Sequence, residues 1–223
     1  MTRKWKPLAM CAEMALAYRQ GRKTATRRLM SPQPEGLLTT IVPGHRYYDN
    51  GPGRIIIPPY KPGDGLWLRE PIRRAIPDSR PAFHPGYVEY TADGVQAPDD
   101  FPWKWQPSAL AGRYMPKILC RTLGICESVR TERVQDITVG DAMAEGITPS
   151  RKHTTWVQGE HPGHLVGISS WILDYADLWN SLHGKKPGER FEDNPPVLVY
   201  CLSKPLTTDH ADAQRMLAEG ETA

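Results

Sequence analysis

The sequence lacks the features that mark membrane, secreted and metal-stabilised proteins. It contains no apolar run of about 18 residues that could span a bilayer, and its N-terminal stretch is too polar for the apolar region of a signal peptide. Its four cysteines include no Cys-x-x-Cys pair, which disfavours a disulfide framework or a zinc site. We therefore expect reduced thiols and a cytoplasmic protein that is not bound to a membrane.

Net charge is also scarce. The 28 Lys and Arg residues exceed the 25 Asp and Glu residues by only three, which is too little for the whole surface to coat a nucleic acid. A local basic patch remains compatible with this balance. The question of partners therefore depends on individual segments.

Proline, by contrast, is abundant. The 22 Pro and 19 Gly among 223 residues predict long loops and exclude an all-helical bundle or a repeat solenoid. Apolar residues make up 39% of the sequence and charged residues 24%, which is typical of a chain that folds around a core. The length favours one domain that needs neither metal nor disulfides for its stability.

Helix signals occur in three places. Apolar spacing predicts a helix from Leu8 to Gln20, and Gly21 is placed to end it. A capping-box pattern at Thr138 and Asp141 predicts a short helix that ends before residue 146. The clearest periodicity begins after a serine cap at 169 or 170 and stops at residue 184.

Strand signals separate these helices. Residues 22–30 are predicted to be a loop that passes into a strand, because two threonines occur in an alternating pattern. Further strands are expected at 54–57, 66–70, 87–91, 118–129 with an irregular continuation to 134, and 197–202. The order of elements predicts an α+β fold around a small curved sheet or barrel.

The loops set the expected domain organisation. We expect one domain over residues 1–204, with insertions near 31–60, 75–112 and 148–168. The remaining residues, 205–223, are expected to form a solvated or weakly helical tail.

A basic segment follows the first predicted helix. Residues 21–28 contain four basic side chains and two threonines, which are Arg22, Lys23, Thr24, Thr26, Arg27 and Arg28. One interpretation is a solvated patch, and the other is a phosphate-facing or catalytic junction. In the second interpretation the arginines disfavour the charged form of Lys23, so that this lysine can act as a base.

Two other positions are candidates on local grounds. Glu145 stands at the C-terminal end of its short helix, where the helix dipole disfavours an anion, and such local conflicts are commonest at functional sites. An exposed glutamate without function is the alternative. Trp67 and Trp179 could stack on a base, although packing in the core is the more common role of such aromatics.

Metal binding is not indicated. His153, His161 and His164 lie in one loop, but no Cys or carboxylate stands at a recognisable ligand spacing from them. We expect no metal and no cofactor.

Three segments resemble the ASCH domain family, which is related to the PUA-like RNA-binding barrels. They are residues 21–28, residues 62–70, and residues 133–137 together with 141–147. Residues 178–182 and the entry into the last strand at 194–196 look like the longer family members of bacteriophages and prophages. The matching segments cover about half of the chain, and the three insertions lie outside them.

The resemblance implies a PUA-like small β-barrel with flanking helices, in the cytoplasm of a bacterial host. A small bacterial enzyme of this family is an amidohydrolase of N(4)-acetylcytidine, and its proposed catalytic lysine, threonine and glutamate look like Lys23, Thr26 and Glu145. By this likeness Thr26 attacks the acyl carbon, Lys23 takes its proton, and Glu145 serves the departing amine. Residues expected to contact a modified nucleoside or nucleic acid are Arg22, Arg27, Arg28, Trp67, Arg69, Glu70, Trp179 and Asn180.

The chain departs from that small enzyme in its length, which is about twice as great, so the insertions could adapt the pocket to another acyl group or base. Other family members bind nucleic acids without catalysis. A binding module for RNA or DNA, which could recognise a modified base, is therefore the alternative. Such a module needs the arginines but has no need of Thr26 and Glu145 together.

Overall fold

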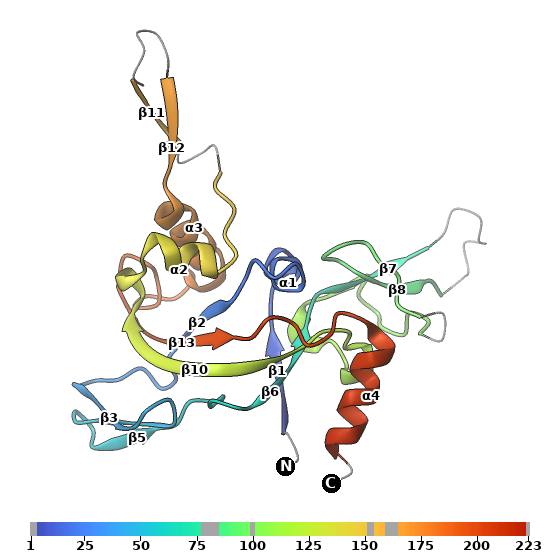
Figure 1. Cartoon of the computed structure of the whole chain (residues 1–223), viewed down its shortest axis with the longest axis horizontal. Coiled ribbons are helices and arrows are strands. Elements are labelled where there is room, and N and C mark those ends of the chain that lie inside the picture. Colours follow the sequence, from blue (N-terminus) through green and yellow to red (C-terminus); the bar gives the residue numbers. More distant parts are fainter. Residues whose placement is uncertain (1–3, 77–84, 99–100, 151–153, 159–164, 222–223) are drawn as a thin grey trace. The chain divides into compact units, whose positions relative to one another are not determined.

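The computed structural model describes residues 4–76, 85–98, 101–150, 154–158 and 165–221, with the backbone alone for 154–158 and 165–169. The chain divides into two compact units that are each assembled from separate segments. Unit 1 comprises Met1–Gly21, Gly63–Cys126 and Ser203–Ala223, and unit 2 comprises Arg22–Pro62 and Glu127–Leu202. Both units combine strands with helices (Figure 1), which confirms the α+β class.

Unit 1 is built on a parallel pair of strands. Strand β1 (Trp5–Ala9) pairs in parallel with β6 (Gly65–Arg69), and β6 pairs antiparallel with the first residues of β10 (Leu123–Arg133). A second sheet consists of β7 (Ile72–Ala75), β8 (Tyr87–Tyr90) and β9 (Ala109–Leu110), in the order β8-β7-β9. The helices of this unit are α1 (Ala12–Arg19), α4 (His210–Glu221) and the 3-10 turns η1 (Gly112–Tyr114) and η2 (Lys117–Leu119).

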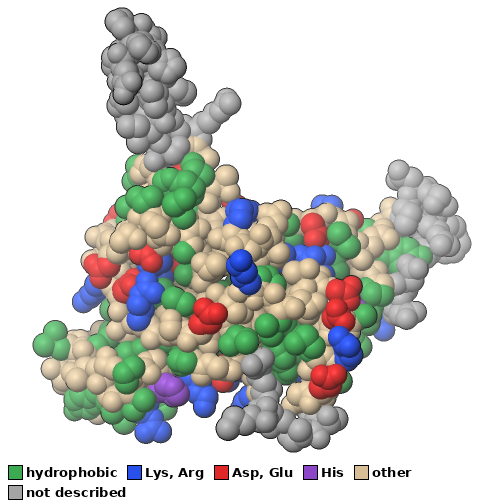
Figure 2. All heavy atoms as spheres, viewed as in Figure 1, with side chains coloured by type: hydrophobic (Ala, Val, Ile, Leu, Met, Phe, Trp, Pro, Cys, Tyr) green, Lys and Arg blue, Asp and Glu red, His purple; other side chains and the backbone are tan. Residues whose placement is uncertain are grey.

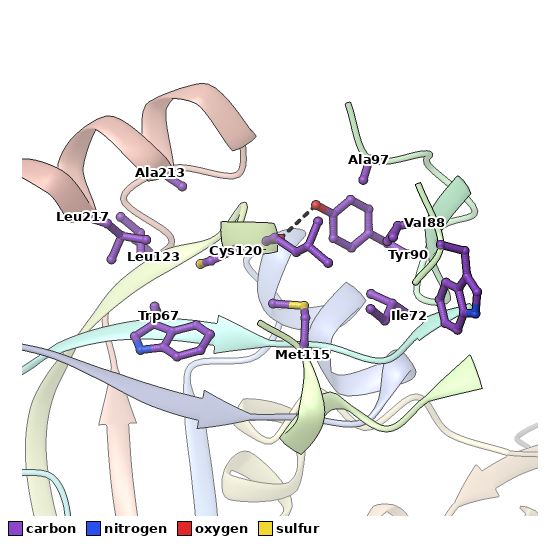
Figure 3. Packing of buried hydrophobic residues seen from close by; sticks show 12 residues of the cluster. Trp67, Ile72, Val88, Tyr90, Ala97, Met115, Cys120, Leu123, Ala213 and Leu217 are labelled. Atoms are coloured by element: carbon purple, nitrogen blue, oxygen red, sulfur yellow. Dashed lines mark hydrogen bonds between the residues drawn. The ribbon is translucent and has the colours of Figure 1, made fainter. Parts of the chain in front are cut away.

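The core of unit 1 joins the sheets to helix α4. Met115, Leu119 and Leu123 are almost fully buried, and Ala213 and Leu217 of α4 pack in the same cluster (Figure 3). The hydroxyl of Tyr90, also in this cluster, donates a hydrogen bond to the Leu119 carbonyl at 2.9 Å, so the buried polar atom has a partner.

Unit 2 contains the remainder of β10, which is followed by the short turn η3 (Val134–Asp136). Strand β13 (Pro196–Leu202) lies between β10 and β2 (Ala25–Leu29), and it pairs antiparallel with β2. The helices are α2 (Val139–Ala144) and α3 (Trp171–His183), and an antiparallel pair is formed by β11 (Thr154–Gln158) and β12 (Leu165–Ser169).

A second small sheet in unit 2 consists of β3 (Leu38–Val42), β4 (Arg46–Asp49) and β5 (Arg54–Ile56). Its inner face buries Tyr47 and Ile56, whereas apolar side chains on the outer side gather at the surface (Figure 2). The exposed members are Leu37, Ile41, Val42, Tyr48, Ile55 and Ile57.

Several predictions of elements are confirmed. Helix α3 begins after Ser170, whose hydroxyl accepts a hydrogen bond from the Leu173 amide, and Gly184 is its C-cap. The capping box of α2 is formed by Thr138 and Asp141. Strands β5, β6, β8 and β13 occur within one residue of their expected bounds at each end.

The expected helix at 8–20 is corrected. Its first residues belong to strand β1, because they pair with β6, and α1 begins only at Ala12. Leu8 and Met10 are both buried, and their spacing of two is the period of a strand. The strand expected from residue 118 also starts later, at Leu123, since a 3-10 turn precedes it.

The segments expected to be loops contain more structure than predicted. Residues 31–60 contain strands β3 and β4 in addition to the predicted strand β5, and residues 148–168 include β11 and part of β12. The tail at 205–223 contains helix α4, which agrees with the helical alternative, and the buried residues of α4 correct the expectation of a solvated segment. Tertiary packing rather than local propensity stabilises these elements, and their sequences therefore carry only weak signals.

Within the described ranges, no sheet closes on itself, and the predicted small barrel stays a prediction. None of the helices in this part of the chain has the length and apolar character needed to cross a membrane.

Candidate active site

Lys23 and Glu145 form a buried ion pair in unit 2. The Lys23 ammonium lies 2.6 Å from Oε2 of Glu145 and also donates to the Glu145 carbonyl at 2.9 Å. Only 2% of Lys23 and 4% of Glu145 is exposed. Removal of these two charges from water carries a desolvation cost, which close partners around the pair must offset.

The backbone brings the two side chains together. Lys23 precedes strand β2 and Glu145 is the C-cap of helix α2, and the Thr24 amide donates to the Ala144 carbonyl at 2.7 Å. The cations beside Glu145 offset the unfavourable position of an anion at a helix C-terminus. The carboxylate of Glu145, which the helix dipole disfavours at this position, is therefore stabilised by tertiary contacts with Lys23 and Arg27.

Arg27 holds the other oxygen of the same carboxylate. Its backbone amide donates to Oε1 of Glu145 at 2.7 Å, and its Nη1 lies 3.4 Å from that oxygen. The amide points outward from β2, which is the terminal strand of its sheet. Glu145 therefore lies beside the edge of β2 that does not pair with β13.

Two more carboxylates complete the cluster around Arg27. Its Nη2 lies 3.0 Å from Glu132 and 3.3 Å from Asp141, and the Arg27 side chain has no exposed area. Burial alone would lower the pKa of this guanidinium, but Glu145 and the other anions around it raise the pKa. Arg130 contacts Glu132 and Asp141 as well, so that three cations meet three carboxylates.

Asp141 performs two tasks. Its Oδ2 accepts hydrogen bonds from the amide and hydroxyl of Thr138, while Oδ1 faces Arg27 and Arg130. Burial would raise the pKa of Asp141, yet the Thr138 hydrogen bonds and the charge of Arg27 lower the pKa to about 2. Asp141 is therefore an anion at any pH near neutrality.

Thr26 is buried, with 4% of the residue exposed, and it lies between Lys23 and Arg27 in the sequence. Strand alternation directs its side chain to the face of β2 opposite to that of Arg27, and its Cα partner on β13 is Tyr200. The structure thus joins Lys23 directly to Glu145 and places Thr26 in strand β2, next to Arg27, whose amide binds Glu145.

The other basic residues of the segment differ in exposure. Arg22 is exposed and donates through Nη1 to the Gly146 carbonyl at 3.2 Å, and Arg28 is half-buried. Arg27 is the member of the three arginines with a fully buried side chain, and its charge is matched by internal carboxylates. Contact with a phosphate is therefore easier for Arg22 and Arg28.

Trp179 and Asn180 organise the loop after helix α3. The indole of Trp179 is 2% exposed, donates to the Glu189 carbonyl at 2.8 Å and has its ring centroid 4.4 Å from that of His183. Asn180 accepts from the Phe191 amide at 2.8 Å and donates to Glu192. Both side chains are engaged in packing, which is the more common role considered for Trp179.

The predicted contact residues of the second motif belong to unit 1. Trp67 is 8% exposed, and the Arg69 guanidinium lies 5.4 Å from the centre of its ring. Glu70 is buried and binds Arg121 through both oxygens, at 2.8 and 2.7 Å. The expectation that these residues contact a substrate stays a prediction.

Sequence reasoning missed the carboxylates around Arg27 and the partner of Glu70. Arg130 and Glu132 are two positions apart and so lie on the same face of β10, a pattern that indicates a shared surface but does not show that Arg27 contacts it. Asp141 was recognised only as a capping residue. The bidentate arrangement of Arg121 on Glu70 had no local signal.

Among the residues that the structure describes, no group of three or more His, Cys, Asp or Glu side chains could hold a metal ion. His153, His161 and His164 lie outside the described residues. All four cysteines are free; Cys120 and Cys126 are buried, and burial raises the pKa of the Cys120 thiol to about 12.

Comparisons with known proteins do not assign the chain to a family: no family model matches the sequence, and no curated protein or solved structure shows significant similarity.

Proposed function

We propose that the chain is an amidohydrolase of the ASCH type, with a PUA-like barrel, which removes the acyl group from an N-acylated cytosine nucleoside or a related modified base. The observation that carries this proposal is the buried contact of 2.6 Å between Lys23 and Glu145 beside strand β2. A lysine and a carboxylate in direct hydrogen-bond contact can exchange a proton, as acyl transfer requires.

The proposed reaction begins with proton transfer from Lys23 to Glu145, which leaves a neutral amine and a carboxylic acid. The hydroxyl of Thr26 attacks the acyl carbon, and its proton passes to Nζ of Lys23. When the bond from the acyl carbon to the exocyclic nitrogen breaks, Glu145 gives its proton to that nitrogen. The ion pair is thereby restored, and the acyl group is an ester of Thr26.

Water completes the cycle. It attacks the ester carbon and its proton passes to Glu145, which then gives that proton to the threonine oxygen as the bond to Thr26 breaks, so that Glu145 is again a carboxylate. The products are the free base or nucleoside and the carboxylic acid.

Burial is the physical argument for a catalytic rather than a structural pair. Replacement of a buried ion pair by apolar residues of similar volume is often neutral or stabilising, so such a pair is seldom explained by a gain in folding stability. Local arrangements that cost stability are concentrated at functional sites. The Lys23–Glu145 pair fits that pattern, and a threonine stands three residues after the lysine.

The proposal is tested by incubation of the purified chain with N(4)-acetylcytidine and chromatography of the products. We expect cytidine and acetate to appear in equal amounts, and a panel of longer acyl groups to report the size of the acyl site. Lack of turnover of every acylated cytidine, together with salt-dependent binding to RNA or DNA, would instead support the non-catalytic binding module.

A further inference from the structure

Arg27 contacts both ends of helix α2. Its guanidinium faces Asp141 in the first turn of the helix and Glu145 at the C-cap, and its backbone amide binds Glu145 as well. We propose that Arg27 is a positioning residue, which fixes the Glu145 carboxylate against Lys23 and does not itself bind substrate. The catalytic consequence rests on the proposed function, whereas the positioning can be tested without it.

Helix α2 needs such a support because it is short. It has six residues, and isolated helices of this length are not stable in water. Asp141 caps the helix through one oxygen and contacts Arg27 at 3.3 Å through the other. Arg27 thus connects the cap at the beginning of α2 to the functional carboxylate at its end.

The charge of Arg27 is already compensated. Three carboxylates surround its guanidinium, at 3.0 Å for Glu132, 3.3 Å for Asp141 and 3.4 Å for Glu145. A phosphate would have to displace one of these anions from a side chain without exposed area. Substrate contact, which the basic segment suggested for Arg27, is therefore less compatible with the site than an internal role.

Arginine suits this role better than lysine. Nη1 faces Glu145 while Nη2 faces Glu132 and Asp141, so separate N–H groups of one planar cation reach different anions. A lysine ammonium would keep the charge but could not reproduce this geometry. The conservative change Arg27→Lys therefore separates position from charge.

The first test is kinetic. In Arg27→Lys we expect kcat for acylated cytidine to fall about 100-fold with KM nearly unchanged, because small displacements of a catalytic group have effects of that size. Asp141→Asn, which weakens only one end of the contact, should give a smaller loss of the same kind. A raised KM with unchanged kcat would show that Arg27 binds substrate and would overturn the proposal.

The second test does not depend on activity. Reductive methylation followed by peptide mass mapping measures the reactivity of Lys23, which is buried and paired, against exposed Lys61 as the internal reference. In Arg27→Lys we expect Lys23 to become about tenfold more reactive relative to Lys61, since its partner Glu145 is then held by the amide of residue 27 without the guanidinium. Arg46→Lys, on the exposed side of β4, is the matched control and should leave this ratio unchanged.

The two tests separate the claims. Increased Lys23 reactivity in a chain that hydrolyses no acylated cytidine would support the positioning role and reject the proposed function. If Lys23 remains protected in both Arg27→Lys and Asp141→Asn while both variants keep the thermal midpoint of the parent, Arg27 does not position Glu145.

Discussion

Nζ of Lys23 and Oε2 of Glu145 are 2.6 Å apart although 122 positions separate the two residues in the chain. Each side chain is almost fully buried, and the Glu145 carboxylate is also bound by the Arg27 amide. The contact links the C-terminus of helix α2 to the segment that precedes strand β2. Its energetic cost and its chemistry both follow from its burial.

Loss of one member of this pair should be strongly destabilising. Lys23→Met leaves Glu145 with less compensation, and we expect the free energy of unfolding to fall by about 3–5 kcal/mol. The double variant Lys23→Met with Glu145→Leu should lose much less than the sum of the single changes, which urea unfolding can measure.

An exposed ion pair provides the control for that cycle. Arg215 and Asp212 are 2.8 Å apart at the surface of α4, and Arg215→Ala should change the free energy of unfolding by about 1 kcal/mol or less. Additive effects of the Lys23 and Glu145 changes would contradict the coupling that the geometry indicates.

The sequence reveals those parts of the fold whose signals are local. Helix α3 has a serine cap, a regular apolar face and a glycine at its end, and α2 has its capping box, so both could be located. Strand β13 is a continuous apolar run. For Lys23 and Glu145, the association came from the family resemblance, since neither periodicity nor spacing relates positions so distant.

Other parts depend on partners that are remote in sequence. Helix α4 has only a few apolar positions in a polar segment, and burial of Leu217 is decided by the core of unit 1. Strands β3 and β4, unlike the predicted strand β5, are short segments in a region of prolines and glycines, which favours a loop interpretation. The anions around Arg27 come from β10 and α2, and a local pattern does not show which cation they meet.

The pKa of Asp141 predicts an acid-dependent contribution to stability. Because its folded pKa of about 2 lies below its ordinary value of 3.8, ionised Asp141 stabilises the fold above that value, and the contribution is lost as pH falls through about 2. Asp141→Asn should therefore reduce the free energy of unfolding near neutral pH by about 1 kcal/mol, after allowance for solvent screening.

Urea unfolding of the parent and Asp141→Asn at neutral and at strongly acidic pH measures this difference. It should shrink in acid, because the parent then carries a protonated Asp141. Asp136→Asn changes another capping carboxylate, in turn η3, and serves as the control. A difference between parent and Asp141→Asn that stays constant over this range would contradict the prediction.

Asp49 should hold the sheet of β3 to β5 together. Its carboxylate accepts from the amides of Glu35, Gly36 and Gly51 at 3.0, 2.9 and 3.2 Å. Burial would raise the pKa of Asp49, but these hydrogen bonds and Arg54 lower the pKa, so the contacts weaken only in acid.

In Asp49→Ala we expect faster hydrogen exchange at those three amides near neutral pH, measured by NMR. The amides that join β2 to β13 should be much less affected, and they provide the reference within the same molecule. Unchanged exchange at Glu35 and Gly36 would mean that Asp49 does not hold this segment.

Helix α4 should contribute measurably to unit 1. Leu217 is 3% exposed, and Leu217→Ala is expected to reduce the free energy of unfolding by about 2–5 kcal/mol, through lost burial and the cavity that remains. Leu206→Ala is the matched control, since Leu206 is 41% exposed and should have a small effect. Similar effects of the two changes in urea unfolding would contradict the packing of α4 in the core.

The most direct test of the proposed chemistry is the turnover number for N(4)-acetylcytidine in the parent chain, Thr26→Val and Thr24→Val. Valine keeps nearly the shape of threonine without its hydroxyl, and Thr24 contributes backbone contacts to Ala144 and Leu202. The account predicts that Thr26→Val loses turnover by orders of magnitude with KM little changed, while Thr24→Val retains it. Full hydrolysis by Thr26→Val would contradict the threonine nucleophile.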